Sequence, residues 1–160
     1  MTNAQGGNFT GAWNNTTPTS SVFTLGNSVE TNTNSGTFVA YCFAPIAGFS
    51  AFGSYTGNGS ATGPFIYTGF QPKFLLIKQS SAAGNYWTII DSTRNTSNWV
   101  NLELHPNTSD AEGNGGTTYK ESFYSNGFQI NQTDATWNAS GATYIYACFA
   151  SNPFAYSNAF

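Results

Sequence analysis

Hydrophobic and aromatic residues in this chain occur in short runs that are separated by clusters of Gly, Asn, Thr, Ser and Pro. None of the runs keeps the helical period of about 3.6 residues, whereas runs with alternation or with β-branched and aromatic residues recur about every ten residues. This pattern predicts an all-β fold, an antiparallel two-sheet β-sandwich of the jelly-roll kind with almost no helix. The expected strands are residues 22–25, 37–43, 51–56, 63–67, 74–78, 86–91, 99–104, 121–124, 127–130 and 143–150.

Three local patterns refine this expectation. Residues 74–77 are apolar on both sides, which indicates a central strand under a second sheet, and we expect residues 86–91 to pair with it. Asn126 and Gly127, flanked by aromatic residues, predict a β-hairpin with a type I′ turn, because both residues tolerate positive φ. Residues 108–112 could form at most one helical turn, since a glycine-rich stretch follows them.

A phrase near the start of the chain recurs near its end. The sequence SGTFVAYCFA at residues 35–44 matches SGATYIYACFA at residues 140–150. We interpret this as a partial repeat, in which residues 13–45 are related to residues 119–152, inside one β-sandwich domain that covers residues 1–160. We therefore expect the chain to open partway through a repeat unit, like a segment of a longer tandem array.

The two cysteines lie at matching places in the two copies, 106 positions apart (148 − 42). Duplication explains this placement without bonding chemistry, so we interpret Cys42 and Cys148 as small buried side chains on equivalent strands. A disulfide between them stays open as an alternative. Two distant thiols and a single histidine do not make a tetrahedral metal site.

Charged residues make up only 7% of the chain, while aromatic residues reach 17% and supply material for a core. The four basic residues are scattered and form no stripe that could neutralise phosphates, so we expect no nucleic-acid binding. The first residues have neither the basic nor the apolar region of a secretion signal, and no apolar run approaches the roughly 20 residues of a membrane span. We therefore expect no membrane partner.

Residues that could carry catalysis are scarce. His105 is the only histidine, and no Ser or Cys lies in a nucleophile motif, so a catalytic triad is hard to build. Asp110 and Glu112 beside a glycine-rich loop lack the spacing of a calcium-binding loop. We expect no enzymatic activity, no cofactor and no metal. The carboxylates for which the sequence gives no sign of convergence are Asp91, Glu103, Asp110, Glu112, Glu121 and Asp134.

Four aromatic residues are candidates for binding a glycan or a neighbouring subunit, because a flat ring can stack on a sugar: Trp137, Trp87, Tyr86 and Trp99. Core packing competes with this role for Trp87 and Trp99, which lie in expected strands. Trp137 lies in a loop of the second copy, where the first copy has Asn32. An exposed loop tryptophan that the sister copy lacks is the better candidate for binding.

The ordered motifs of the chain resemble a known family. They are YCFAPIAGFSAFGSYTGNGSATGPFIYTGFQPKFLLIK, WTIIDSTRN, HPNTSDAEG, YSNGFQI, NASGATYIYACFA and NPFAYSNAF, and they span almost the whole chain from about Trp13. This series resembles an uncharacterised repeated domain of bacteriophage tail and tail-fibre-like virion proteins, found in marine and cyanobacterial phages. The resemblance implies a component of the extracellular virion, made in the host bacterial cytoplasm, and it supplies no catalytic or binding residues.

The sequence and the resemblance together predict a phage virion structural protein of the tail-fibre or fibre-like class, which acts by subunit assembly and by attachment to the host surface. The alternatives are a capsid decoration (cement) protein and a glycan-binding module that recognises the host receptor. We expect a homo-oligomer, with a trimer favoured because fibres and decorations are often threefold. Further expected partners are other virion proteins and a host surface polysaccharide.

Overall fold

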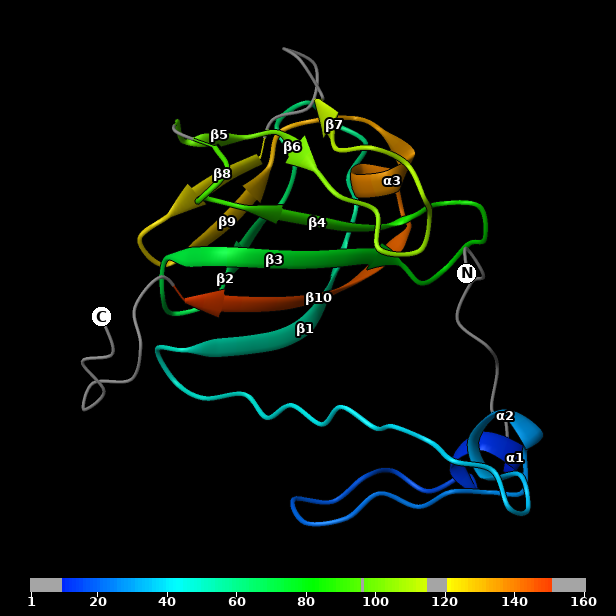
Figure 1. Cartoon of the computed structure of the whole chain (residues 1–160). Helices are drawn as coiled ribbons and strands as arrows, with labels where there is room; N and C mark the ends of the chain where they lie inside the picture. Colours follow the sequence, from blue (N-terminus) through cyan, green and yellow to red (C-terminus); the bar gives the residue numbers. More distant parts are fainter. Residues whose placement is uncertain (1–9, 96, 115–120, 151–160) are drawn as a thin grey trace. The chain divides into compact units, whose positions relative to one another are not determined.

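The computed structural model describes residues 10–95, 97–114 and 121–150 (Figure 1). The chain divides into two compact units, which we call the N-terminal unit (Gln5–Phe43) and the β unit, which continues from Ala44. Two such units can still fold as one domain, so the single domain over residues 1–160 stays a prediction.

Within its described residues, the β unit holds two four-stranded antiparallel sheets and one two-stranded sheet (Figure 1). Sheet A has the order β1 (Ser50–Thr56), β10 (Thr143–Ala150), β3 (Pro72–Gln79) and β4 (Trp87–Asp91). Sheet B has the order β2 (Phe65–Tyr67), β9 (Gly127–Ile130), β8 (Glu121–Tyr124) and β5 (Trp99–Val100). The small sheet pairs β6 (Leu102–Glu103) with β7 (Gly113–Asn114).

One hydrophobic core joins the two large sheets. Alternate residues of each strand point to one face of its sheet, and most of the inward-facing ones are apolar, so the two sheets bury them against each other. The all-β prediction is therefore confirmed, and residues 74–77 do lie in a strand with neighbours on both sides. The buried core residues of the sheets are Tyr55, Leu75, Ile77, Ile90, Tyr144 and Cys148 from sheet A, and Ile66, Val100, Phe123, Phe128 and Ile130 from sheet B.

The strand predictions fail in the N-terminal unit. Residues 22–25 and 37–43 were expected to be strands, but in the described chain neither segment pairs with another strand. A strand needs a neighbour that satisfies its backbone groups, and the periodicity of a sequence does not show whether that neighbour is present. Residues 99–104 hold two short strands instead of one, and residues 108–112 hold no helix.

The predicted hairpin between β8 and β9 is present, but its turn differs. Tyr124 lies opposite Gly127, so the turn consists of Ser125 and Asn126, one residue earlier than expected. Neither Asn126 nor Gly127 has a positive φ, and the type I′ prediction is wrong. Gly127 is needed for a different reason, because a Cβ atom there would lie 2.2 Å from the carbonyl oxygen of Ile66 on β2.

Within its described residues, 10–43, the N-terminal unit has two short helical turns joined by a loop, and a segment without helix or strand follows the second turn. The turns are α1 (Thr10–Trp13) and α2 (Val29–Asn32), neither of which was predicted. The backbone N–H of Gly26 donates to the carbonyl oxygen of Ala12 at 3.0 Å, which ties the two turns together.

One local geometry occurs in both units. The turn α3 (Ala135–Asn138) of the β unit begins like α2, because Ser28 and Asp134 each cap a turn by accepting the backbone N–H two residues later. After each turn the chain passes through a left-handed residue, with φ of 63° at Ser35 and 75° at Gly141. Each of these pairs is 106 positions apart (134 − 28 and 141 − 35).

The last residue of each turn makes the same hydrogen bond. The side-chain Nδ2 of Asn32 donates to the carbonyl oxygen of Gly26 at 2.7 Å, and Nδ2 of Asn138 donates to that of Gln132 at 2.8 Å. Both the donors (138 − 32) and the acceptors (132 − 26) are again 106 positions apart. This geometry pairs Asn32 with Asn138, so our alignment of Asn32 with Trp137 is wrong by one residue.

Asn138 makes more contacts than its counterpart and is fully buried. Its Oδ1 accepts the backbone N–H of Asn58 at 2.8 Å, and its Nδ2 also donates to the carbonyl oxygen of Ser60 at 2.8 Å. The side chain therefore fastens α3 to the connection between β1 and β2, and these bonds satisfy its own buried polar atoms.

We expect Asn138→Ala to lower the free energy of unfolding by about 3 kcal/mol, because the buried carbonyl oxygen of Gln132 and the part-buried groups of Asn58 and Ser60 each lose a partner at about 1–3 kcal/mol. Asn32→Ala is the matched control, since Asn32 is exposed and makes one of these bonds; it should cost less than about 1 kcal/mol. Urea-induced unfolding of both variants measures the difference. Equal losses would contradict this role of Asn138.

Candidate functional site

Trp137 is not the exposed loop residue that we expected. It lies in α3 with 1% of its surface exposed, and its indole N–H hydrogen-bonds the carboxyl group of Glu103. Its carbonyl oxygen accepts the hydroxyl of Tyr55 at 2.8 Å. The prediction failed because the short turn α3 packs against the sandwich, where its tryptophan becomes part of the core. The ring of Trp137 offers no face to a glycan.

The other three aromatic candidates lie at the beginnings of two strands that belong to different sheets. Tyr86 precedes β4 and is partly exposed, with its ring 4.7 Å from that of His105. Trp87 begins β4, is half-buried, and donates its backbone N–H to Oδ1 of Asn107 at 3.0 Å. Trp99 begins β5 and is 56% exposed. The structure thus places Tyr86 and Trp87, which are adjacent in the sequence, at sheet A, and Trp99 in sheet B.

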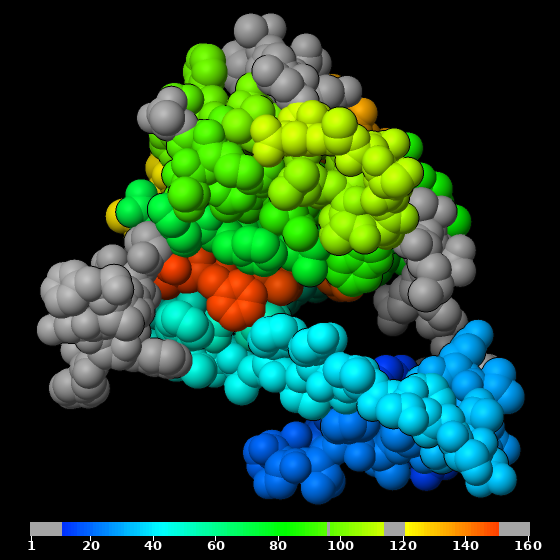
Figure 2. Space-filling model, in the orientation of Figure 1, coloured from blue at the N-terminus to red at the C-terminus, as the bar shows by residue number. Residues whose placement is uncertain are grey.

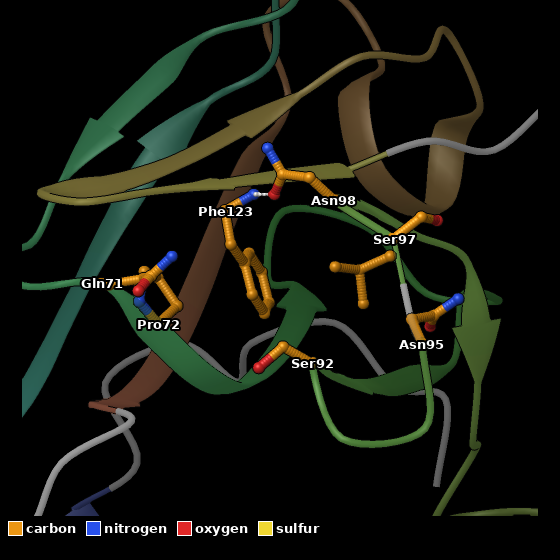
Figure 3. Close-up of a pocket in the computed structure, with 8 residues that line it drawn as sticks. Gln71, Pro72, Ser92, Asn95, Ser97, Asn98 and Phe123 are labelled. Carbon is orange, nitrogen blue, oxygen red and sulfur yellow. Dashed lines mark hydrogen bonds between the residues drawn. The ribbon is translucent and has the colours of Figure 1, made fainter.

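A shallow pocket of about 290 Å³ lies beside β5 (Figure 3). Its apolar floor includes the buried Val100 and Phe123, and Oδ1 of Asn98 accepts the backbone N–H of Phe123 at 3.1 Å. No charged residue lines it, so it suits a neutral ligand with hydroxyl groups. The sequence signal for it is the Asn- and Ser-rich connection between β4 and β5. The lining residues are Gln71, Pro72, Ser92, Asn95, Ser97, Asn98, Val100 and Phe123.

The structure brings together three carboxyl groups for which the sequence gave no sign of convergence. Burial, together with a smaller contribution from the charge of Asp134, raises the pKa of Glu121 to about 8 and that of Glu103 to about 7. Glu121 is fully buried, so a substrate cannot reach its carboxyl group. Among the described residues, no group of three or more potential ligands is arranged to hold a metal ion.

The remaining acidic candidates lie elsewhere. Arg94 contacts Asp91 and Glu112, each at 2.6 Å, and these pairs fasten the end of β4 to the segment before β7. Asp110 is exposed. Glu112 therefore forms an ion pair with Arg94, and Asp110 and Glu112 do not form a joint calcium site.

The most exposed apolar segment among the described residues of the N-terminal unit is residues 37–43, whose sequence matches that of β10. Val39 is 76% exposed and Tyr41 is 83% exposed, and in the space-filling view the cyan stretch forms a narrow run of side chains (Figure 2). Cys42 is exposed, whereas its counterpart Cys148 is completely buried in β10. The expectation that both cysteines are buried on equivalent strands is therefore wrong for Cys42. Both thiols are free.

A contiguous apolar segment of this kind is a candidate interaction surface, because soluble proteins seldom leave one uncovered. In the described residues, no helix has the length and apolar character that a bilayer crossing requires.

The fold and these sites define a charge-poor, all-β module with a buried core and an exposed apolar segment. A family model described as a domain of unknown function (DUF7483) matches residues 1–153, and the chain belongs to this family. No curated protein matches the chain. No solved structure matches it either.

The two cysteines should differ strongly in reactivity. The thiolate is the reactive form, and burial raises the pKa of the Cys148 thiol to about 12, so Cys148 should react only when the β unit unfolds. In dilute native protein, a thiol reagent should label Cys42 alone. Mass spectrometry of the labelled protein checks this, with Cys42→Ser as the control. Rapid labelling of native Cys42→Ser would contradict the burial of Cys148.

Proposed function

We propose that the chain is a structural protein of a bacteriophage particle, of the tail-fibre or fibre-like class, and that it works by assembling with further copies of its own module. The resemblance of its ordered motifs to phage tail proteins supports the phage class. The observation that carries the assembly function is the exposed segment at residues 37–43.

This segment has the sequence character of a central strand. Its counterpart β10 pairs with β1 on one side and with β3 on the other, in antiparallel register along its length. Residues 37–43 are apolar on both faces, as expected of a strand that is covered on both sides. Left uncovered, such a segment exposes apolar side chains that another strand could cover.

The partner that fits residues 37–43 best is another module of the same family. β10, which shares the sequence of this segment, pairs with β1 and β3. Strands like β1 and β3 in another module would therefore offer residues 37–43 matching register and side chains. A threefold oligomer is the arrangement typical of fibres and decorations.

Val39→Asp should weaken self-association at least about tenfold, because a carboxylate in a strand interface must give up its hydration. Val29→Asp is the matched control, since Val29 is 75% exposed against 76% for Val39 but lies in α2. Light scattering over a concentration series measures association. A wild-type chain that stays monomeric, or equal effects of the two substitutions, would contradict the assembly function.

The virion class has its own test. Antibody labelling of purified particles in the electron microscope should place the chain on the tail or on a fibre. A label over the capsid shell would instead favour the decoration protein, and the absence of any label would contradict a virion component.

A glycan-binding module is the second candidate, and the uncharged pocket favours it, together with the exposed Trp99, which lies in the sequence between the lining residues Asn98 and Val100. Amide and hydroxyl groups in the pocket can bind sugar hydroxyls, while an exposed ring can stack on the apolar side of a sugar.

If this second function holds, host surface polysaccharide should change the tryptophan fluorescence, and Trp99→Ala should abolish the change. Trp13→Ala is the control, because Trp13 is 52% exposed but lies in the N-terminal unit. A response that survives Trp99→Ala, or no response of the wild type, would remove the glycan-binding reading.

A further inference from the structure

Glu121 occupies an unusual place for an acid. It is the first residue of β8, opposite Val100 of β5 and Ile130 of β9, and none of its surface is exposed. An ionised carboxyl group in such a place is costly unless cations or several donors surround it.

The surroundings of Glu121 supply one donor. Nε2 of Gln132, also buried, donates to Oε1 of Glu121. Two other buried oxygens of the same two side chains, Oε2 of Glu121 and Oε1 of Gln132, have no hydrogen-bond partner among the described residues. If Glu121 is ionised, both of these oxygens are acceptors and neither can satisfy the other.

A single proton removes this conflict. We propose that Glu121 keeps its proton at neutral pH and that its Oε2–H donates to Oε1 of Gln132, which closes a cyclic pair between a carboxylic acid and an amide. Both carboxyl oxygens of Glu121 and both polar atoms of the Gln132 amide group then take part in a hydrogen bond, and no charge is buried.

The charges around the pair favour the protonated form. Glu103 from β6 and Asp134 at the start of α3 both act on Glu121 as negative charges, and the hydroxyl of Tyr55 from β1 lies close enough to interact with it. Among the described residues, the one basic side chain paired with these acids is His105, whose Nε2 lies 3.8 Å from Oε2 of Glu103 and which does not pair with Glu121 itself. The pKa of Glu121, raised chiefly by burial, agrees with this arrangement.

The pair also has a mechanical role. Gln132 lies between β9 and α3, and its carbonyl oxygen accepts Nδ2 of the buried Asn138. The acid–amide pair therefore joins β8 to the segment that positions α3 and, through it, Trp137. Loss of the proton in alkaline solution would put a charge between the sheets and loosen this join, which makes the pair a pH-sensitive latch.

The sign of the pH effect follows from the direction of the shift. The folded chain keeps a proton that the unfolded chain releases near its ordinary pKa, so the stabilisation by Glu121 is complete below that value. It falls as the pH rises and is lost once the pH passes about 8. Across this window, the unfolding equilibrium constant should rise by up to about tenfold per pH unit from this group.

Glu121→Gln is the decisive variant, because a glutamine has the same shape and carries the donor permanently. It should fold, resist urea better than the wild type at pH 9, and lose most of the pH dependence between pH 5 and pH 9 that Glu121 causes. Asp110→Asn is the control, since Asp110 is exposed, and it should keep the pH dependence of the wild type. Infrared spectra at pH 7 should show the carbonyl band of an unionised carboxyl group in the wild type and a weaker band in Glu121→Gln.

Three results would overturn the proposal. One is an unchanged infrared band in Glu121→Gln, and another is a variant that is less stable than the wild type at pH 9 with the same pH dependence. The third is a rise in wild-type stability on addition of calcium that Glu121→Gln abolishes, because an ionised Glu121 would then be holding a cation.

Discussion

The β unit depends on one strand that is paired along both of its edges. β10 lies between β1 and β3, and its alternate residues Tyr144 and Cys148 enter the core without any exposed surface. Because both edges are paired, the backbone groups of β10 can hydrogen-bond to β1 or to β3, and both faces of the strand can be apolar. The aromatic side chains on the outer face add edge-to-face contacts, as Phe149 does with Phe52 and Phe74.

The same sequence character in the N-terminal unit, at residues 37–43, comes without either neighbour among the described residues. The local geometry before it is also the same, since α2 and α3 share their caps and the hydrogen bond of their last asparagine. The two segments therefore differ in their neighbouring strands and not in their sequence character or in the local geometry before them. A segment that forms a strand only between two others would join modules, because assembly would cover its apolar side chains.

Sequence periodicity was enough to predict the all-β class, the paired strands β3 and β4, and the hairpin of β8 and β9. It failed where the structure depends on contacts between distant residues. Trp137 looked like an exposed loop residue because one turn of helix leaves almost no periodic signal, and the bonds of Asn138 to the β1–β2 connection span about eighty residues of chain. The convergence of Glu103, Glu121 and Asp134 could not be seen either, since pairing of β5 with β8 and the position of α3 create it.

The central claim is that residues 37–43 form a strand when modules assemble. Hydrogen exchange of their backbone amides, compared between dilute and assembled protein, tests it most directly. The account predicts fast exchange in dilute solution and, on assembly, slow exchange that approaches that of β10 (Thr143–Ala150). Fast exchange of residues 37–43 in the assembled protein, with β10 protected, would contradict it.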